Sequence, residues 1–263
     1  MAIELYLQKN IKTGHIVQPD TIRFVSEEMY HKWMKEEIQR GDIIITSEAP
    51  FGQILYWDSN EKIVLSQRLF GVRIKEGYDS RFVYYYMTTQ DFQGEMDGRA
   101  TGTTVVGLRQ PELMKCVVRC PDLETQSKIA SVLSSIDEKI LLNEQINENL
   151  DQQATAIFSE LTKGVTFKKP LSDFIKIKHG YAFKGDYISP EDNGIVLVTP
   201  GNFCIGGGFK ESKCKYFTAE YPKGYVLQPD SLIVTMTDLS KEADTLGFGA
   251  IVPRSSERVY LHN

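Results

Sequence analysis

The chain has 263 residues, 41% of them hydrophobic, which is enough apolar material for more than one folded domain. Its formal net charge of -5 excludes a polycation that binds nucleic acid over its whole surface, so any such contact must come from local patches. Aromatic residues make up 11% of the chain, a proportion typical of β-rich domains.

The N-terminus has neither the basic start nor the apolar run of a signal peptide, and no stretch is apolar for long enough to span a bilayer. We therefore expect a cytoplasmic protein that does not contact a membrane. The cysteines form no CxxC pair and have no histidine at metal-ligand spacing, so we predict buried, reduced thiols, no metal site and no cofactor. These cysteines are Cys116, Cys120, Cys204 and Cys214.

The first part of the chain is predicted to be β-rich. The β-branched run at residues 43–46 and the segment 53–57 predict two short strands around a loop, and residues 62–74 add strand-like sequence. Residues 80–96 predict one short helix with four aromatic side chains on one face. These are Phe82, Tyr85, Tyr86 and Phe92. A Gly/Thr-rich loop, a turn and a final strand are expected before Pro121.

A long helix is predicted next. Residues 126–163 contain neither proline nor glycine, and Gly164 follows as a stop. At about 1.5 Å per residue, such a helix is roughly 55 Å long. Its apolar positions alternate by four and three, which indicates a heptad seam that needs a partner helix. The predicted helix-pairing residues are Ile129, Leu133, Ile136, Ile140, Asn143, Asn147, Leu150, Ala154, Ile157 and Leu161.

Two asparagines leave the centre of this seam open to two interpretations. If Asn143 and Asn147 lie in the seam, they weaken its packing and fix its register. If they face solvent, the seam shifts to Leu142 and Ile146. The pattern supports both.

Residues 165–263 are predicted to be a second β-rich region that repeats part of the first. Residues 5–16 are similar to 196–209, residues 40–50 to 228–240, and residues 51–67 to 248–263. The common order of the three matches indicates a duplicated domain. We therefore predict an α+β fold in which two partial β-rich domains are joined by one long, coiled-coil-forming helix.

Five segments together resemble the specificity subunit of type I restriction–modification systems. They are "GDIIITSEAPFGQ", "IVLSQRL", "FVYYYMTTQDF", "ATGTTVVGLRQPELMKCVVRCPDLETQSKIASVLSSIDEKILLNEQINENL" and "LSDFIKIKHGYAFKGDY". The resemblance implies two target-recognition domains, each of which reads half of a split site in double-stranded DNA. Two long antiparallel helices would hold them apart and dock methyltransferase subunits, which recruit the restriction subunit.

On this resemblance, residues 1–122 are the C-terminal part of a first target-recognition domain, residues 123–164 the spacer helix and residues 165–263 the N-terminal part of a second domain. Complete members carry both domains and both helices, so we expect a truncated or rearranged specificity subunit. A homodimer through the central helix is one way to pair the seam.

Two loops offer candidate DNA contacts. In the first, glycine permits close backbone approach, hydroxyls can bond phosphate or base, and arginine adds charge; its residues are Arg99, Thr101, Gly102, Thr103 and Thr104. The second mixes basic and aromatic side chains around a glycine, and its candidates are Lys178, Tyr181 and Lys184. An ordinary packing loop and a capping turn explain the two segments equally well.

The sequence has no Asn-Pro-Pro-aromatic run, no G-x-G-x-x-G on a strand-to-helix turn and no Walker A lysine loop. It therefore predicts a non-catalytic subunit, with catalysis in the methyltransferase and nuclease partners. The alternative is a coiled-coil protein-interaction scaffold, or an inactive truncated specificity cassette, that does not bind DNA. The acidic net charge mildly favours this alternative.

Overall fold

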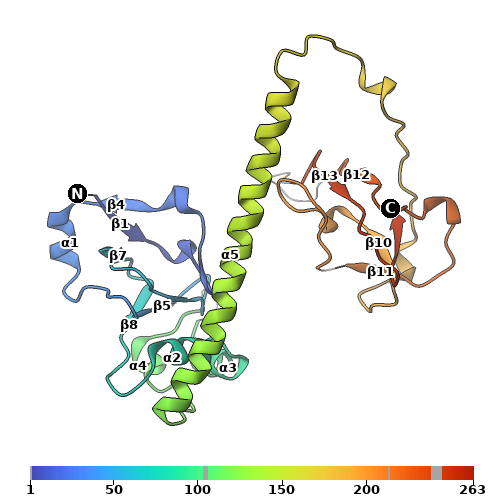
Figure 1. The fold of residues 1–263 in the computed structure, drawn as a ribbon. Coiled ribbons are helices and arrows are strands. Elements are labelled where there is room, and N and C mark those ends of the chain that lie inside the picture. Colours follow the sequence, from blue (N-terminus) through green and yellow to red (C-terminus); the bar gives the residue numbers. More distant parts are fainter. Residues whose placement is uncertain (1, 103–105, 213, 238–244) are drawn as a thin grey trace. The chain divides into compact units, whose positions relative to one another are not determined.

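The chain divides after Gly164 into two compact units, Met1–Gly164 and Val165–Asn263, called here the first and second units (Figure 1). The computed structural model describes residues 2–102, 106–212, 214–237 and 245–263. Within these ranges, no helix is long and apolar enough to cross a membrane. The long helix belongs to the first unit.

The first unit contains two small sheets, a two-stranded ribbon, short 3₁₀ turns and a group of helices. In chain order its elements are β1 (Ile3–Tyr6), η1 (Gln8–Asn10), β2 (Ile11–Lys12), β3 (His15–Ile16), η2 (Pro19–Thr21), β4 (Arg23–Val25), α1 (Glu27–Trp33), β5 (Ile43–Thr46), β6 (Ile54–Tyr56), β7 (Ile63–Leu65), β8 (Leu69–Val72), α2 (Ser80–Met87), α3 (Gln90–Arg99), α4 (Gln110–Leu113) and α5 (Leu123–Thr162).

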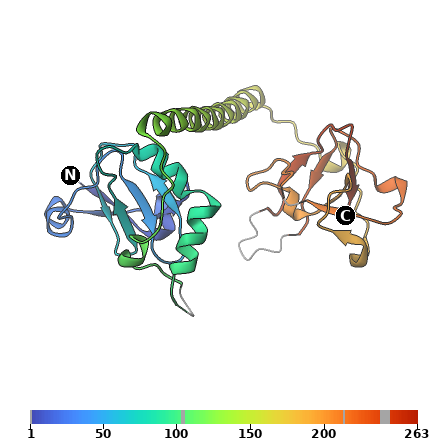
Figure 2. The same cartoon turned by 90° about the horizontal axis from the view of Figure 1, so that it is seen from below.

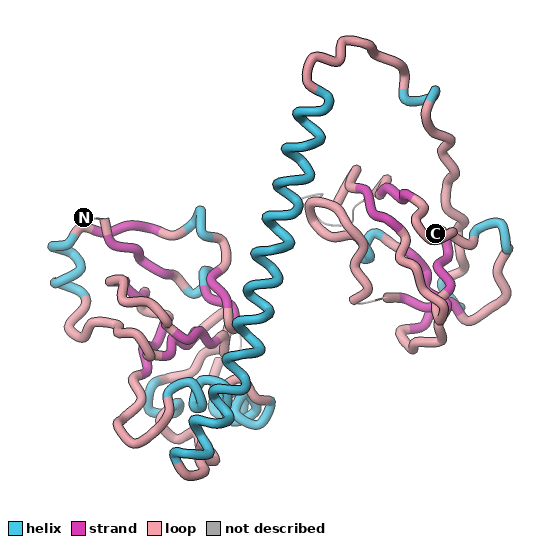
Figure 3. Tube along the Cα trace, viewed as in Figure 1, coloured by secondary structure: helices cyan, strands magenta, loops and turns pink. Residues whose placement is uncertain are grey.

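One sheet has the strand order β4-β1-β7 and the other β6-β5-β8 (Figure 3). In the first sheet β1 runs antiparallel to β4 and parallel to β7, whereas every pair in the second is antiparallel. The predicted strands at residues 43–46 and 53–57 are thus confirmed as β5 and β6, and β7 and β8 supply the strands expected in residues 62–74.

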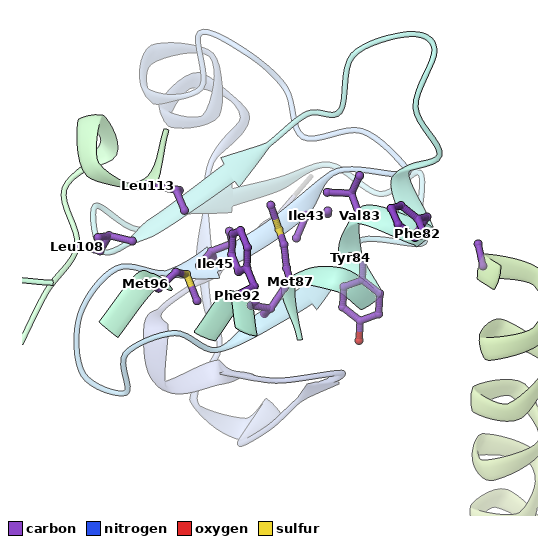
Figure 4. Close-up of a cluster of buried hydrophobic side chains, with 12 residues drawn as sticks. Ile43, Ile45, Phe82, Val83, Tyr84, Met87, Phe92, Met96, Leu108 and Leu113 are labelled. Carbon is purple, nitrogen blue, oxygen red and sulfur yellow. The ribbon is translucent and has the colours of Figure 1, made fainter. Parts of the chain in front are cut away.

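The main core of the first unit lies between β5–β6 and the helices that follow them in sequence (Figure 4). Alternation along β5 directs Ile43 and Ile45 toward this core, and both are fully buried. Their partners from α2, α3 and the segment up to α4 include Phe82, Met87, Phe92, Met96, Leu108 and Leu113.

The prediction of one short helix over residues 80–96 is wrong, because α2 and α3 are separate helices. The hydroxyls of Thr88 and Thr89 bond back to backbone carbonyls of α2, and the Thr89 side chain also caps α3 by accepting a hydrogen bond from Phe92 N. Such local bonds compete with helix continuation. All four aromatic side chains nevertheless pack against one core, with Phe82 and Phe92 buried and Tyr85 and Tyr86 partly buried.

The strand predicted before Pro121 is also absent, since residues 116–121 are extended without strand pairing. The thiols differ from expectation too: Cys120 is exposed, and the other three cysteines are partly buried.

The long helix α5 confirms the central prediction and has 40 residues. It begins three residues earlier than expected, because the Asp122 carboxylate accepts a hydrogen bond from Thr125 N at 2.9 Å and so caps the first turn. It ends at Thr162, and Gly164 takes a left-handed φ of 80° just beyond, as predicted for the stop.

The second unit is likewise built from short strands and 3₁₀ turns. Its elements are η3 (Leu171–Asp173), η4 (Gly185–Tyr187), β9 (Ile188–Ser189), β10 (Ile195–Val198), η5 (Pro200–Asn202), β11 (Lys215–Phe217), η6 (Lys223–Tyr225), β12 (Leu232–Val234), β13 (Gly249–Ile251) and β14 (Val259–His262). They form a sheet of order β14-β10-β11-β9 and the hairpin β12-β13.

The structure confirms the internal repeat. β1 lies between antiparallel β4 and parallel β7, and β10 lies between antiparallel β11 and parallel β14. A short turn with a fully buried asparagine follows each central strand: Asn10 accepts a hydrogen bond from Leu7 N at 3.1 Å, and Asn202 accepts one from Thr199 N at 2.9 Å. The repeat therefore extends to individual side-chain contacts.

The register of the predicted repeat needs a shift of one residue in the first strand of each hairpin and of two residues in the second, where Ile54 and not Gly52 is equivalent to Gly249. Trp57 N bonds Asp42 O in the first unit, and Val252 N bonds Ser231 O in the second. Asp42 is therefore equivalent to Ser231, not to Asp230 as the aligned segments suggest. The two aspartates differ physically as well, since Asp230 itself takes a left-handed φ of 64°.

The two hairpins differ in what covers them. Ile43 of β5 is 0% exposed beneath α2 and its neighbours, whereas Leu232, at the equivalent position of β12, is 65% exposed. Val234 and Ile251 are also exposed. The apolar face that forms the core of the first unit thus lies open on the second.

Candidate nucleic-acid interface and helix surface

The loop after α3 is closed on itself by its backbone. Thr101 and Gly107 exchange two hydrogen bonds, of 2.9 and 3.0 Å, and Gly102 takes a φ of 126° that favours glycine. Of the predicted contact residues in this loop, Thr101 and Gly102 are therefore placed at its closed base. Thr103 and Thr104 lie outside the described residues.

The loop is anchored to the connection between β5 and β6. Leu108 N donates to Ser47 O at 2.9 Å, and a Cβ at Gly107 would lie only 3.1 Å from Glu48 Cγ. The turn between β2 and β3 reaches the same connection, because Thr13 N donates to Gln53 Oε1 at 3.0 Å. These three segments form one edge, which we call the loop rim: residues 12–14, 47–53 and the described parts of 99–107.

Arg99 is engaged within its own domain. Its Nη2 lies 3.3 Å from Glu95 Oε2, and its Nη1 lies 4.0 Å from Glu112 Oε2. Lys115 donates to the same Glu112 at 2.6 Å, and this hydrogen bond lowers the pKa of the Glu112 carboxyl. The arginine charge is thus largely balanced by carboxylates, of which Glu95 lies one helical turn earlier and Glu112 belongs to another helix.

Two other cations lie on or beside the rim. Lys12 is exposed at the start of the β2–β3 turn, and Arg68 lies 3.0 Å from Glu48 beside the β5–β6 connection. Gln53 is a further side chain on the rim that sequence reasoning missed. Its signal was weak, because a glutamine after a glycine is common in turns.

The predicted contacts of the second unit cluster around aromatic rings. Lys178 Nζ lies 4.4 Å from the centroid of Tyr225 and donates to Gly224 O. Tyr181 stacks at 5.0 Å from the same ring, and its N–H bonds His262 O at 2.9 Å. Tyr181 remains 43% exposed. The structure therefore brings Lys178 and Tyr181 together.

Lys184 lies apart from this pair in its contacts. It is exposed and occupies the position before the first residue of η4. His262, whose backbone carbonyl accepts the hydrogen bond from Tyr181, has a side-chain pKa that is lowered by burial and, in the same direction, by the charge of Lys178.

The first unit docks on α5 through a narrow stripe of small and polar residues. Only Gln126, Ala130 and Ser134 are buried along the described length of this helix. Gln126 Oε1 accepts from Asp79 N at 3.0 Å, and Tyr85 donates to Asp137 Oδ2 at 2.7 Å. α2 therefore holds the N-terminal half of α5, while the C-terminal half lies clear of the sheets of the first unit (Figures 1 and 2).

The docked stripe is not the predicted seam. Ile136 is 50% and Leu150 57% exposed, and of the predicted pairing residues only Leu133 is partly buried. The others lie exposed as well: Ile129, Ile140, Asn143, Asn147, Ala154, Ile157 and Leu161. Leu142 and Ile146 are also exposed, so both interpretations of the seam stay open.

The first unit thus consists of a small β-rich domain attached to one end of a long helix, and among the described residues no group of three His, Cys, Asp or Glu could hold a metal ion. The chain belongs to the family of type I restriction modification DNA specificity domains, whose model matches residues 8–152. The match covers the β-rich part of the first unit and most of α5.

Two specificity subunits illustrate the relatives. The type I restriction enzyme MjaVIII specificity subunit of Methanocaldococcus jannaschii is 27% identical over 151 residues, which are 55% of this chain and 36% of that protein. The HindI specificity subunit of Haemophilus influenzae is 29% identical over 141 residues, 47% of this chain and 28% of that protein. The chain thus matches about a third of the length of these relatives.

Two solved structures are similar more loosely. The HsdS subunit from Thermoanaerobacter tengcongensis has a TM-score of 0.43 at 13% identity, covering 97% of this chain and 68% of that one. A type I S subunit from M. genitalium has a TM-score of 0.49 at 18% identity, covering 86% and 57%.

Proposed function

We propose that this chain is a DNA-reading part of a type I restriction–modification specificity subunit. The observation that carries the proposal is the family match over residues 8–152. In this proposal the loop rim of the first unit faces one half of a split target in double-stranded DNA. The segment around Lys178 and Tyr181 is the corresponding candidate surface of the second unit.

The geometry of the rim supports this role. Its three segments are tied to one another by backbone and side-chain hydrogen bonds and rise from a buried sheet, so they can present donors and acceptors in a fixed arrangement. DNA reading needs cations that contact phosphates and polar side chains that reach base edges. Lys12 is a candidate phosphate contact, and Arg68 and Arg99 become candidates once they loosen their pairs with Glu48 and with Glu95 and Glu112.

The long helix supports a spacer role. Major-groove faces recur about every 34 Å along DNA, so two reading domains must be held at a matching separation. With 40 residues, α5 is roughly 60 Å long and rigid where a flexible linker would not be. We propose that it pairs with a second helix and that this assembly docks methyltransferase subunits, through them the restriction subunit, while this chain contributes no catalytic step.

A binding titration tests the DNA proposal. Fluorescently labelled random-sequence duplex is titrated with the chain, alone and with methyltransferase subunits, between about 50 and 300 mM salt. A DNA reader loses affinity steeply as salt rises, since phosphate contacts release counterions. Affinity that does not depend on salt, or no binding even in the assembled complex, would contradict the proposal.

Variants then locate the surface. Arg99→Ala with Thr103→Ala tests the loop after α3, and Lys12→Ala with Arg68→Ala tests the remainder of the rim. Lys32→Ala, on α1 and outside the rim, is the matched control because it also removes one exposed charge. Wild-type affinity in both rim variants would move the reading surface elsewhere.

The second candidate function is a protein-interaction scaffold without DNA contact. The net charge of -5 and the engaged state of Arg99 favour it. It predicts that the chain binds methyltransferase subunits with unchanged affinity in all the rim variants and shows no salt-dependent DNA binding.

A further inference from the structure

An acidic row borders the exposed seam of α5. Asp137, Glu144 and Asp151 recur at seven-residue intervals, and each directly follows a predicted seam residue. Because an α-helix nearly repeats its direction every seven residues, the three carboxylates line one edge of the seam. All three residues are exposed.

The helix itself does little to balance this row. No lysine or arginine occurs between Lys139 and Lys163, whereas Glu144, Glu148, Asp151 and Glu160 all lie in that interval. The two ion pairs within the described part of α5 lie near its ends, Lys128 with Glu124 and Lys163 with Glu160. Asp137 receives a hydrogen bond from the neutral hydroxyl of Tyr85.

The opposite edge of the seam carries a single cation. This edge consists of the residues that directly precede every second seam residue, from Leu133 to Leu161. They are Val132, Lys139, Ile146, Gln153 and Glu160. In a parallel pair of two copies, this edge would face the acidic row and offer one lysine to three carboxylates. In an antiparallel pair, the acidic row would face its own copy, where like charges destabilise the pairing.

We propose that the seam of α5 is a docking surface for a helix of different sequence that carries lysine or arginine opposite Asp137, Glu144 and Asp151. A second copy of this chain does not meet this requirement in either orientation. The partner is therefore a long amphipathic helix with a basic edge, which supplies both the apolar cover and the charge that the seam lacks. The inference specifies the partner of the helix pairing proposed above and does not depend on DNA reading.

Three synthetic peptides of residues 126–163 test the proposal against the full chain. One has the native sequence, one carries D137K/E144K/D151K, and one carries the neutral changes D137N/E144Q/D151N. Binding is measured by fluorescence anisotropy at 50 and 500 mM salt, and circular dichroism checks the helicity of each peptide. The neutral peptide separates removal of repulsion from gain of attraction.

An antiparallel peptide places its positions 137, 144 and 151 opposite the acidic row of the chain, so in this orientation we expect the lysine peptide to bind at least about tenfold more tightly than the native peptide at low salt, with the neutral peptide between them. The difference should narrow at high salt, because exposed charges are screened. Leu150→Asp in the full chain should abolish binding of all three peptides, which places the contact on the seam.

Three outcomes would overturn the proposal: equal binding of the native and lysine peptides, no binding by any peptide, or self-association of the chain, seen by light scattering, that is tighter than lysine-peptide binding. None of these outcomes involves DNA, so failure of the helix inference is distinguishable from failure of DNA reading.

Discussion

Gln126 of α5 accepts a hydrogen bond from the backbone N–H of Asp79, the capping residue of α2, at 3.0 Å. The same amide donates to Pro121 O at 2.8 Å, and the side chain is 2% exposed. One buried polar group thus joins the start of the spacer helix both to the domain and to the segment that leads into the helix.

Gln126→Ala should lower the free energy of unfolding of the first unit by about 1–3 kcal/mol, because it removes a buried side chain that hydrogen-bonds the backbone N–H of Asp79 and the carbonyl of Pro121. Urea denaturation followed by circular dichroism measures the change. Gln152→Ala, on the exposed part of the same helix, is the control and should cost less than about 0.5 kcal/mol. Equal small losses in both variants would show that this contact does not hold the helix.

Alkaline pH should weaken the contact between Tyr85 and Asp137. Burial and the hydrogen bond to Asp137 raise the pKa of Tyr85 to about 12. The folded state therefore holds the phenol proton more tightly than the unfolded state, whose tyrosine titrates near pH 10. This contribution is complete below about pH 10 and is lost as the pH rises toward 12.

The test compares the free energy of unfolding of the wild type and Tyr85→Phe at pH 8, 10 and 11. The stability advantage of the wild type should be constant at low pH and shrink above about pH 10. A difference that stays constant through pH 11 would mean that the phenol proton is not held in this way.

The buried asparagine after β1 should be essential to its unit. Asn10 donates to Thr21 Oγ1 at 2.9 Å and to Gln18 O at 3.2 Å. Asn10→Ala should cost about 2–4 kcal/mol, since it removes a fully buried side chain to which several backbone groups are hydrogen-bonded. Thermal unfolding measures the loss, and Asn149→Ala on exposed α5 is the control. A loss below about 1 kcal/mol would contradict the structural role.

Truncation to alanine at equivalent positions of the two hairpins should lower stability by very different amounts. Ile43→Ala removes a fully buried side chain and should cost about 2–5 kcal/mol. Leu232→Ala, at the equivalent position of β12, should cost less than about 1 kcal/mol, because its side chain is mostly in water. Hydrogen exchange resolved by unit measures both. A large loss for Leu232→Ala would indicate that its side chain is covered in solution.

Sequence reasoning succeeded where periodicity is long or repeated. The uninterrupted run before Gly164 predicts α5 nearly to the residue, and the β-branched run predicts β5, because such patterns report burial directly. The internal repeat is detectable for the same reason, although its predicted register differs by one or two residues at the hairpins, where short apolar runs align almost equally well in neighbouring registers.

The contacts that position the candidate site could not be predicted. The docked stripe of α5 consists of Gln126, Ala130 and Ser134, which give no hydrophobic periodicity, so the sequence draws attention to the seam instead. Of the two partners of Arg99, Glu95 lies at an i,i+4 spacing that the sequence contains, whereas Glu112 comes from a separate helix and could not be predicted. The break between α2 and α3 depends on two threonine hydroxyls, whose choice between solvent and backbone is decided by local geometry.

The docked stripe attaches α5 to its domain only near the N-terminal end of the helix. The last buried residue is Ser134, and the helix continues to Thr162, roughly 40 Å farther. A rotation of about 5° at the stripe therefore displaces the far end by roughly 3–4 Å, comparable to the rise of one base pair. The stiffness of the contacts at the docked stripe, more than the stiffness of the helix, therefore determines how accurately the far end of α5 is positioned. A second helix packed along the seam would restrict this rotation.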